Sequence, residues 1–328
     1  MNKDFTRFLL QIFKLVGLSC IAIVVVCIIG KFVIGCQYED NYQASIIGKI
    51  ARLKAINEPK IILVGNSNLA FGMNSPMLQE AMNMPVVNLG LHGGLGNAFH
   101  ENMAKLNINS GDIVIICHTD YSDDDTITDT TLLWVTLEYH FDLWSILRAK
   151  DYPEFIRRML IYWCRGLVKK IEGYIYPNED NKATDYLRER FNKYGDIARR
   201  QQPNASLAEN NYRQDSVKVP EINDICINRL NELNAFVKSK NAVMLVAGYP
   251  ICSGKYIPPA EKYIEFQEEL DSKLDCEVIS DYTDYFIPSR YFYDGILHLT
   301  EEGARIRTRQ LIKDLLAWKN KHNNSPAN

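Results

Sequence analysis

The chain has 328 residues, of which 47% are hydrophobic, and its formal net charge is −3. This length and apolar content allow one domain with a large core plus additional segments. A nearly neutral chain with scattered basic residues is not expected to bind nucleic acid. The eight cysteines include no CxxC pair and predict neither a zinc site nor a disulfide framework, so we expect no metal.

An apolar segment near the N-terminus predicts a membrane anchor. Residues 15–30 are uncharged, and with their flanks they make an apolar stretch of about 20 residues, enough to cross a bilayer as a helix. Basic residues outnumber acidic ones before it, which favours a cytoplasmic N-terminus. We therefore predict a cytoplasmic tip and single-pass anchor in residues 1–36, at the cell membrane, with the remaining chain extracytoplasmic.

Three other interpretations of this segment stay open. A cleaved signal peptide would need a shorter apolar core and a small-residue cleavage site. The sequence Val33-Ile-Gly-Cys36 resembles a bacterial lipobox, which would place an acyl chain on Cys36. A buried core helix is the third alternative, although the stretch shows no amphipathic pattern.

Downstream of a stalk helix predicted within 37–58, short β-branched runs alternate with helical patterns. Runs that are apolar throughout are typical of parallel strands buried on both faces. We predict a three-layer α/β/α domain with a five-stranded parallel sheet, formed by residues 59–121 and 221–320. The expected strands are 60–64, 85–89, 113–117, 242–247 and 276–280, and the expected helices are 75–82, 96–107, 221–240, 258–274 and 300–320.

The pattern is interrupted between the two parts of this domain. Residues 122–220 contain no clear strand and combine many aromatic residues with Arg and Lys. They predict a helical insertion that caps the carboxyl edge of the sheet or rests near the membrane surface, or else an ordinary helical subdomain. Its last part, from about 199, reads as a loose loop, and residues 321–328 as a tail.

The residues that could carry out a reaction lie at the ends of the predicted strands. Ser67 follows the first strand on the turn Gly65-Asn66, and Asp294 and His298 precede the last helix. A histidine can take the proton of a serine hydroxyl, and a carboxylate orients that histidine, so these three residues predict acyl-transfer chemistry. The backbone N–H of Ser67 or Asn68, together with that of Gly90, would stabilise the oxyanion.

These residues resemble the SGNH (GDSL-like) hydrolase superfamily. Gly65-Asn66-Ser67 matches its first block, Gly90 its second, and Asp294, His298 and Gly303 its last. The resemblance covers about 60–120 and 240–318 and implies an SGNH/flavodoxin-like fold that needs no metal or organic cofactor. Membrane-anchored relatives with insertions, such as teichoic-acid D-alanylation and alginate acetylation proteins, imply a glycan or acylated envelope polymer as substrate and a membrane acyltransferase as partner.

The match departs from the family pattern in two places. The Asp294–His298 spacing is one residue longer than usual, so Asp281 or Asp284 are alternatives for the carboxylate. The third-block asparagine is absent, which leaves Gly93, His118 or Asn97 to complete the oxyanion site. The prediction is a membrane-anchored serine esterase or O-acyltransferase; the alternative is a non-catalytic binding or assembly factor that uses the aromatic insertion.

Overall fold

The computed structural model describes residues 3–122, 130–175, 186–198 and 217–323. At its centre is a parallel five-stranded sheet with the strand order β2-β1-β3-β4-β6. The α/β class and the predicted sheet are thereby confirmed. The strands are β1 (Ile61–Val64), β2 (Val86–Asn88), β3 (Ile113–Ile116), β4 (Val243–Val246) and β6 (Glu277–Val278).

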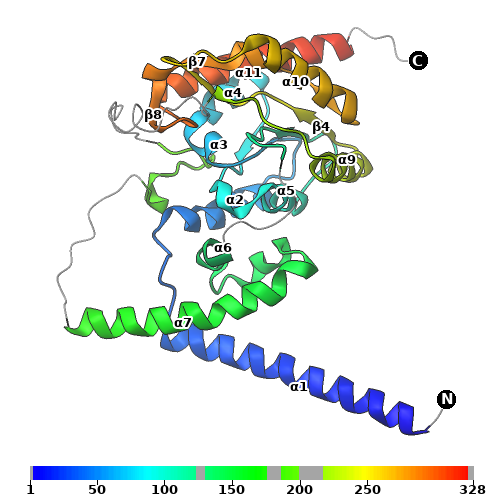
Figure 1. The fold of residues 1–328 in the computed structure, drawn as a ribbon, viewed down its shortest axis with the longest axis vertical. Helices are drawn as coiled ribbons and strands as arrows, with labels where there is room; N and C mark the ends of the chain where they lie inside the picture. Colours follow the sequence, from blue (N-terminus) through cyan, green and yellow to red (C-terminus); the bar gives the residue numbers. More distant parts are fainter. Residues whose placement is uncertain (1–2, 123–129, 176–185, 199–216, 324–328) are drawn as a thin grey trace.

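Helices cover both faces of this sheet (Figure 1). Alternate side chains of each strand point to opposite faces, so Ile62 and Val64 join one core cluster and Ile61 and Leu63 the other. One face packs against α2 (Ser45–Ala55), α5 (Asn97–Lys105), α9 (Asp224–Ser239) and α10 (Ala260–Lys273); the other packs against α4 (Ser75–Met82) and α11 (Glu301–Asn323).

Two small sheets were not predicted, because strands of two to four residues carry too little pattern. Strand β5 (Ile251–Ser253) pairs in parallel with β7 (Phe286–Pro288). Strand β8 (Phe292–Gly295) pairs with β9 (His298–Leu299) as an antiparallel hairpin. This hairpin leads directly into α11 and carries the predicted aspartate and histidine.

The predicted stalk helix belongs to the domain instead. Ile46, Ile50 and Leu53 of α2 form one apolar stripe, and all three are buried against the sheet. A stalk helix would leave such a stripe in water, so this part of the prediction is wrong. The linker between α1 and the domain is reduced to the few residues between Val33 and Tyr42.

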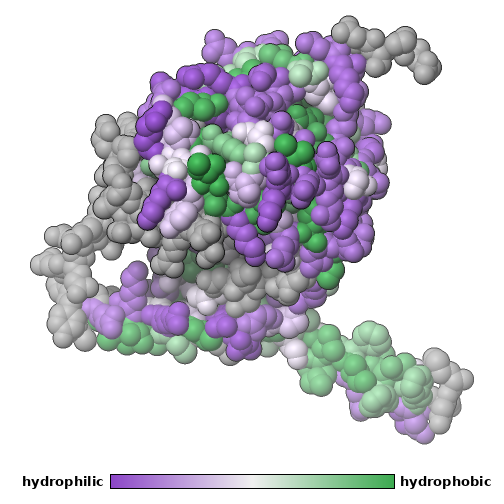
Figure 2. Space-filling view, turned by 45° about the horizontal axis from the view of Figure 1, so that its top comes forward, coloured by the Kyte–Doolittle hydropathy of each residue, from purple (hydrophilic) through white to green (hydrophobic). Residues whose placement is uncertain are grey.

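The N-terminal helix α1 (Lys3–Val33) is long and apolar enough to cross a membrane, and almost all of it is exposed (Figure 2). At 1.5 Å per residue it is about 46 Å long, which exceeds a bilayer's hydrocarbon core. It meets the insertion, whose described helices are α6 (Thr130–Leu137) and α7 (Tyr152–Ile175). The part of the insertion predicted as a loose loop lies mostly outside the described residues.

Residues 186–198, called here the strap, return from the insertion to the sheet domain. The Asn88 N–H donates to Tyr194 O and the Ile197 N–H to Ala70 O. The strap therefore lies against the end of β2 and against the helix that follows β1. Sequence patterns placed it in the helical insertion, but its only helical element is the 3₁₀ turn Arg188–Arg190 within this described segment.

A buried lysine ties the strap to α2. Lys49 is 2% exposed, and its ammonium donates to Asn88 O and Gly195 O. Burial lowers the pKa of Lys49 to about 7, although the charge of Asp196 opposes this shift. The folded protein thus holds Lys49 neutral at a pH at which the unfolded chain keeps it charged.

Stability should therefore rise with pH above 7. Between the folded and unfolded pKa values of Lys49 the unfolded chain binds one more proton, so unfolding becomes costlier by about 1.4 kcal/mol per pH unit. Lys49→Met should remove this rise, whereas Lys54→Met, at an exposed position on the same helix, should keep it. Urea denaturation at about pH 7.5 and about pH 9.5 measures both, and an unchanged slope in Lys49→Met would contradict the assignment.

Candidate active site

The turn after β1 presents Ser67 at the carboxyl edge of the sheet. Ser67 is the first residue of α3 (Ser67–Gly72), and Asn66 caps this helix by accepting from the Asn68 N–H at 2.9 Å. Gly65 is required because a Cβ there would lie 2.8 Å from the Cys117 carbonyl oxygen. Strand β1, the glycine and the cap together fix where the hydroxyl points.

The three predicted catalytic residues meet at this edge. Ser67 Oγ lies 2.9 Å from His298 Nε2, and His298 Nδ1 lies 2.7 Å from Asp294 Oδ1. Both distances are within hydrogen-bonding range. Residues 231 positions apart in the sequence thus form a continuous serine–histidine–aspartate chain.

The β8–β9 hairpin explains how a four-residue spacing brings the carboxylate to the imidazole. Asp294 lies on β8 and His298 opens β9, and Gly295 pairs with His298 across the turn. Phe71 of α3 stacks on the His298 ring with their centroids 4.0 Å apart. The hairpin sets the imidazole position, and the phenyl ring fixes its plane.

The alternative carboxylates have other partners. Asp281 accepts from the N–H and hydroxyl of Thr283, and Asp284 accepts from the Gln310 amide. Only Asp294 of these three has a hydrogen bond to His298 within the described residues. The longer spacing is thus accommodated by the hairpin.

Tyr186 of the strap is a fourth member that sequence reasoning missed. Its hydroxyl donates to Asp294 Oδ2 at 2.5 Å. Burial alone would raise the pKa of Asp294, but the hydrogen bonds from His298 and Tyr186 and the charge of His298 outweigh it and lower this pKa. The carboxylate therefore stays ionised beside the imidazole.

We expect Tyr186→Phe to reduce kcat/KM for a p-nitrophenyl ester about 3- to 30-fold, since a hydrogen bond to a charged group is worth about 1–2 kcal/mol. Without this donor the pKa of Asp294 rises, so the acid limb of the pH–rate profile should move to higher pH. Tyr152→Phe, which loses a hydrogen bond to Trp144 O inside the insertion, should change neither. A tyrosine that merely packs would lower activity without moving the acid limb.

The predicted oxyanion residues are only partly available. The Asn68 N–H donates to Asn66 and the Gly90 N–H to the Asn88 side chain at 2.9 Å, so both amides are engaged. Gly93 borders the turn, since a Cβ there would lie 3.6 Å from Asn66 Cβ. The Ser67 N–H makes no hydrogen bond to any described residue and is therefore available to an oxyanion.

The two side chains proposed in place of the absent asparagine each have a hydrogen-bond partner other than Ser67. His118 is fully buried, with Nε2 3.0 Å from Glu101, which also pairs with Arg229. Asn97 donates to Asp120 O at 2.8 Å. These hydrogen bonds occupy His118 Nε2 and the Asn97 amide nitrogen.

Two further residues, Thr119 and Arg307, support the turn that carries Ser67. Asn66 donates to the Thr119 hydroxyl at 2.7 Å, which links the ends of β1 and β3, where the strand order reverses. Ligands of open α/β sheets bind at such switch points. Buried Arg307 of α11 donates to Asn68 O at 2.8 Å and so holds α3, which begins at Ser67, in place.

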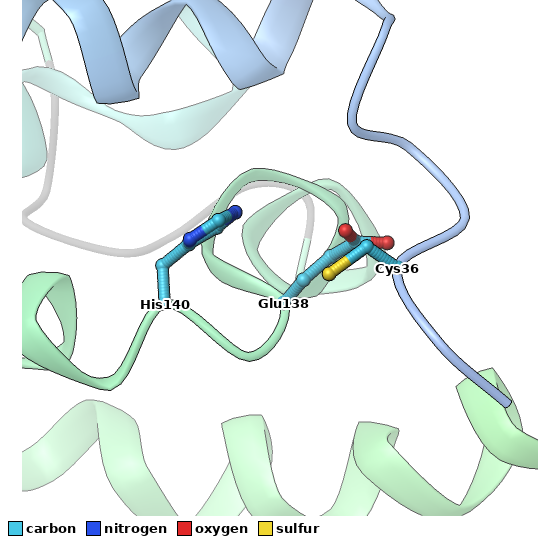
Figure 3. Close-up of side chains that lie close together, drawn as sticks. All are labelled: Cys36, Glu138 and His140. Atoms are coloured by element: carbon cyan, nitrogen blue, oxygen red, sulfur yellow. The ribbon is translucent and has the colours of Figure 1, made fainter. Parts of the chain in front are cut away.

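Among the described residues, one group of side chains could be considered for a metal. Ligand atoms of Cys36, Glu138 and His140 lie within 4.8 Å of one another; Cys36 comes from the linker after α1 and the other two from the turn after α6 (Figure 3). Glu138 already accepts from the Tyr162 hydroxyl and from two linker N–H groups. Burial and Glu138 raise the pKa of Cys36 to about 11, which disfavours a thiolate ligand. The group suits a structural junction better than a metal centre.

Comparison with known proteins gives no match to this chain: no family model, no curated protein and no solved structure. Functional inference therefore rests on the geometry of the site.

Proposed function

We propose that the chain is a membrane-anchored serine esterase or O-acyltransferase of the SGNH type. The observation that carries this proposal is the chain of hydrogen bonds from Ser67 through His298 to Asp294, with separations of 2.9 and 2.7 Å. This arrangement of nucleophile, base and orienting acid is what acyl transfer requires. The position at the switch point between β1 and β3 supports a substrate site there.

The reaction follows from these contacts. Ser67 Oγ attacks the acyl carbonyl carbon while its proton passes to His298 Nε2, and Asp294 stabilises the resulting imidazolium. The Ser67 N–H faces the developing oxyanion. The acyl C–O bond then breaks, and the leaving oxygen takes the proton from His298. Water, or a hydroxyl of an acceptor, attacks the acyl-enzyme by the same route and returns the proton to Ser67.

The surroundings of the site leave it accessible to a substrate. The side chains of Asp294 and His298 are 16% and 19% exposed, so the triad lies at the surface rather than in a closed cavity. Helix α1 would anchor the domain at the cell membrane with its catalytic part extracytoplasmic. A glycan or other acylated polymer of the cell envelope is the substrate class that fits an exposed, anchored site.

A fluorophosphonate probe tests the proposal. The probe phosphonylates a serine only when a base activates its hydroxyl, so the full chain in detergent should be labelled, and peptide mapping should place the label on Ser67. Heat-denatured protein is the control and should not react. Labelling elsewhere, or none with folded protein, would refute the proposed activity.

The alternative is a non-catalytic binding or assembly factor that would use the aromatic insertion to contact a membrane partner. In the described part of the insertion, Trp134, Phe155 and Tyr162 are at most 6% exposed and pack against one another. They form the core of this subdomain, and their burial favours the enzyme over the binding factor.

A further inference from the structure

Helix α7 (Tyr152–Ile175) has two apolar faces, and the residues that the structure describes cover only one of them. Phe155, Met159 and Tyr162 are buried in the insertion core. On the opposite side, Leu167, Val168 and Ile171 are about half exposed (50%, 53% and 51%). Cys164, also exposed, precedes them at helical spacing and extends the same stripe. We call these four residues the outer stripe.

The outer stripe is bordered by positive charge. At 100° per residue, Arg165 falls on one side of it and Lys170 on the other, and both are exposed; exposed Glu172 lies beside Arg165. An apolar stripe with basic flanks is typical of a helix that lies in the headgroup region of a bilayer. The flanking cations favour anionic lipids, because a basic residue near the surface of such a membrane is attracted to it.

Helix α7 is held at the point where α1 leaves the domain. A Cβ at Gly30 would lie 2.5 Å from the Trp163 ring, and one at Gly166 would lie 2.7 Å from the Ile34 side chain, so the two helices approach closely. Lys170 also donates to Val33 O at the end of α1. The apolar surface of α1 therefore ends directly beside α7.

Both apolar surfaces lie on the side of the molecule away from the sheet. Figure 1 shows α7 between α1 and the sheet domain, and Figure 2 shows green along the edge of this helix that faces away from the domain. We propose that α7 lies in the headgroup layer of the membrane that α1 spans, with the outer stripe toward the acyl chains and its basic flanks beside anionic phosphates. This second contact would hold the catalytic domain at a fixed height above the bilayer.

The inference rests on the membrane anchoring in the proposed function but not on its chemistry. Its test uses the full chain in lipid nanodiscs, with Cys20 and Cys164 replaced by alanine and an environment-sensitive fluorophore on Leu167→Cys. Ile264→Cys is the matched control, because Ile264 is an apolar residue, 46% exposed, on α10 of the sheet domain. Quenching is measured with nitroxide-labelled lipids and with aqueous iodide. Serine labelling of the same samples reports separately on the chemistry.

We expect lipid quenching at position 167 to exceed that at 264 by at least about threefold, with iodide quenching in the reverse order. Phosphatidylglycerol should strengthen lipid quenching relative to phosphatidylcholine alone, and Arg165→Glu should reduce that increase. Equal iodide access at 167 and 264 would overturn the proposal. So would protection from both quenchers with energy transfer between two labelled copies, because another protein chain would then cover the stripe.

Discussion

Ser67→Ala should lower the hydrolysis of p-nitrophenyl acetate by the full chain by at least about 10³-fold, because a triad without its nucleophile keeps only binding and oxyanion stabilisation. The hydroxyl lies 2.9 Å from His298 Nε2 and the stacked Phe71 ring holds that imidazole, so no other described serine has this base. Steady-state rates and fluorophosphonate labelling of the purified chain measure the loss.

The controls for this variant separate chemistry from folding. Ser272→Ala removes an exposed serine of α10 that bonds only to its own helix, and it should change neither rate nor labelling. His298→Ala should cost about as much as Ser67→Ala, and the double variant no more than either, since members of one relay are not additive. Activity in Ser67→Ala above about a tenth of the normal rate would rule out Ser67 as the nucleophile.

The sheet could be read from the sequence because its physical signal is local. Runs such as Ile61–Val64 and Ile113–Ile116 are short and apolar at every position, which is typical of strands buried on both faces. The same logic did not extend to α2: an apolar stripe at Ile46, Ile50 and Leu53 predicts a helix but not the surface that the stripe packs against. Whether such a helix is a stalk or a domain layer depends on tertiary contacts.

The hydrogen-bonded cluster of Ser67, His298 and Asp294 was predictable in its residue types but not in its geometry. A serine after the first strand and an Asp/His pair before the last helix are sequence signals, whereas the hairpin that brings Asp294 to His298 comes from strands of four and two residues. Tyr186 gave no signal at all, because it lies in a region with no strand pattern and reaches the site only through long-range contacts of the strap. Thr119, by contrast, could be noticed in the sequence, because it is a polar residue just after the third predicted strand.

The expected oxyanion donors show a different limit of prediction from sequence. Sequence places Asn68 and Gly90 near the nucleophile, yet the direction of an N–H depends on which side chain lies next to it. Asn66 captures one of these amides and Asn88 the other. Asparagine commonly accepts from the backbone N–H two residues later, so both contacts have local causes that a reading of the sequence could include.

Asp196→Ala should be the most destabilising single change in the strap, by about 3–5 kcal/mol. Asp196 is 2% exposed and accepts from the Ser75 N–H (2.8 Å), the Ser75 hydroxyl (2.6 Å) and the Asn88 amide (2.8 Å). Alanine would leave these buried donors without an acceptor and Lys49 without its nearby charge, which are costs of this order. The urea midpoint of the near-UV circular dichroism of the full chain in detergent measures the loss.

Asp281→Ala is the matched control, since Asp281 is exposed and caps only a short 3₁₀ turn; it should cost about 1 kcal/mol. The same pair of variants also tests the link to function. If Asp196 holds the strap and the strap positions Tyr186, then Asp196→Ala should lower kcat/KM at permissive temperature, and adding Tyr186→Phe should change it little further. Additive losses of kcat/KM would mean that Tyr186 reaches Asp294 independently of the Asp196 contacts. A loss of stability in Asp196→Ala no larger than that in Asp281→Ala would mean that the strap is held mainly by its backbone hydrogen bonds to Asn88 and Ala70.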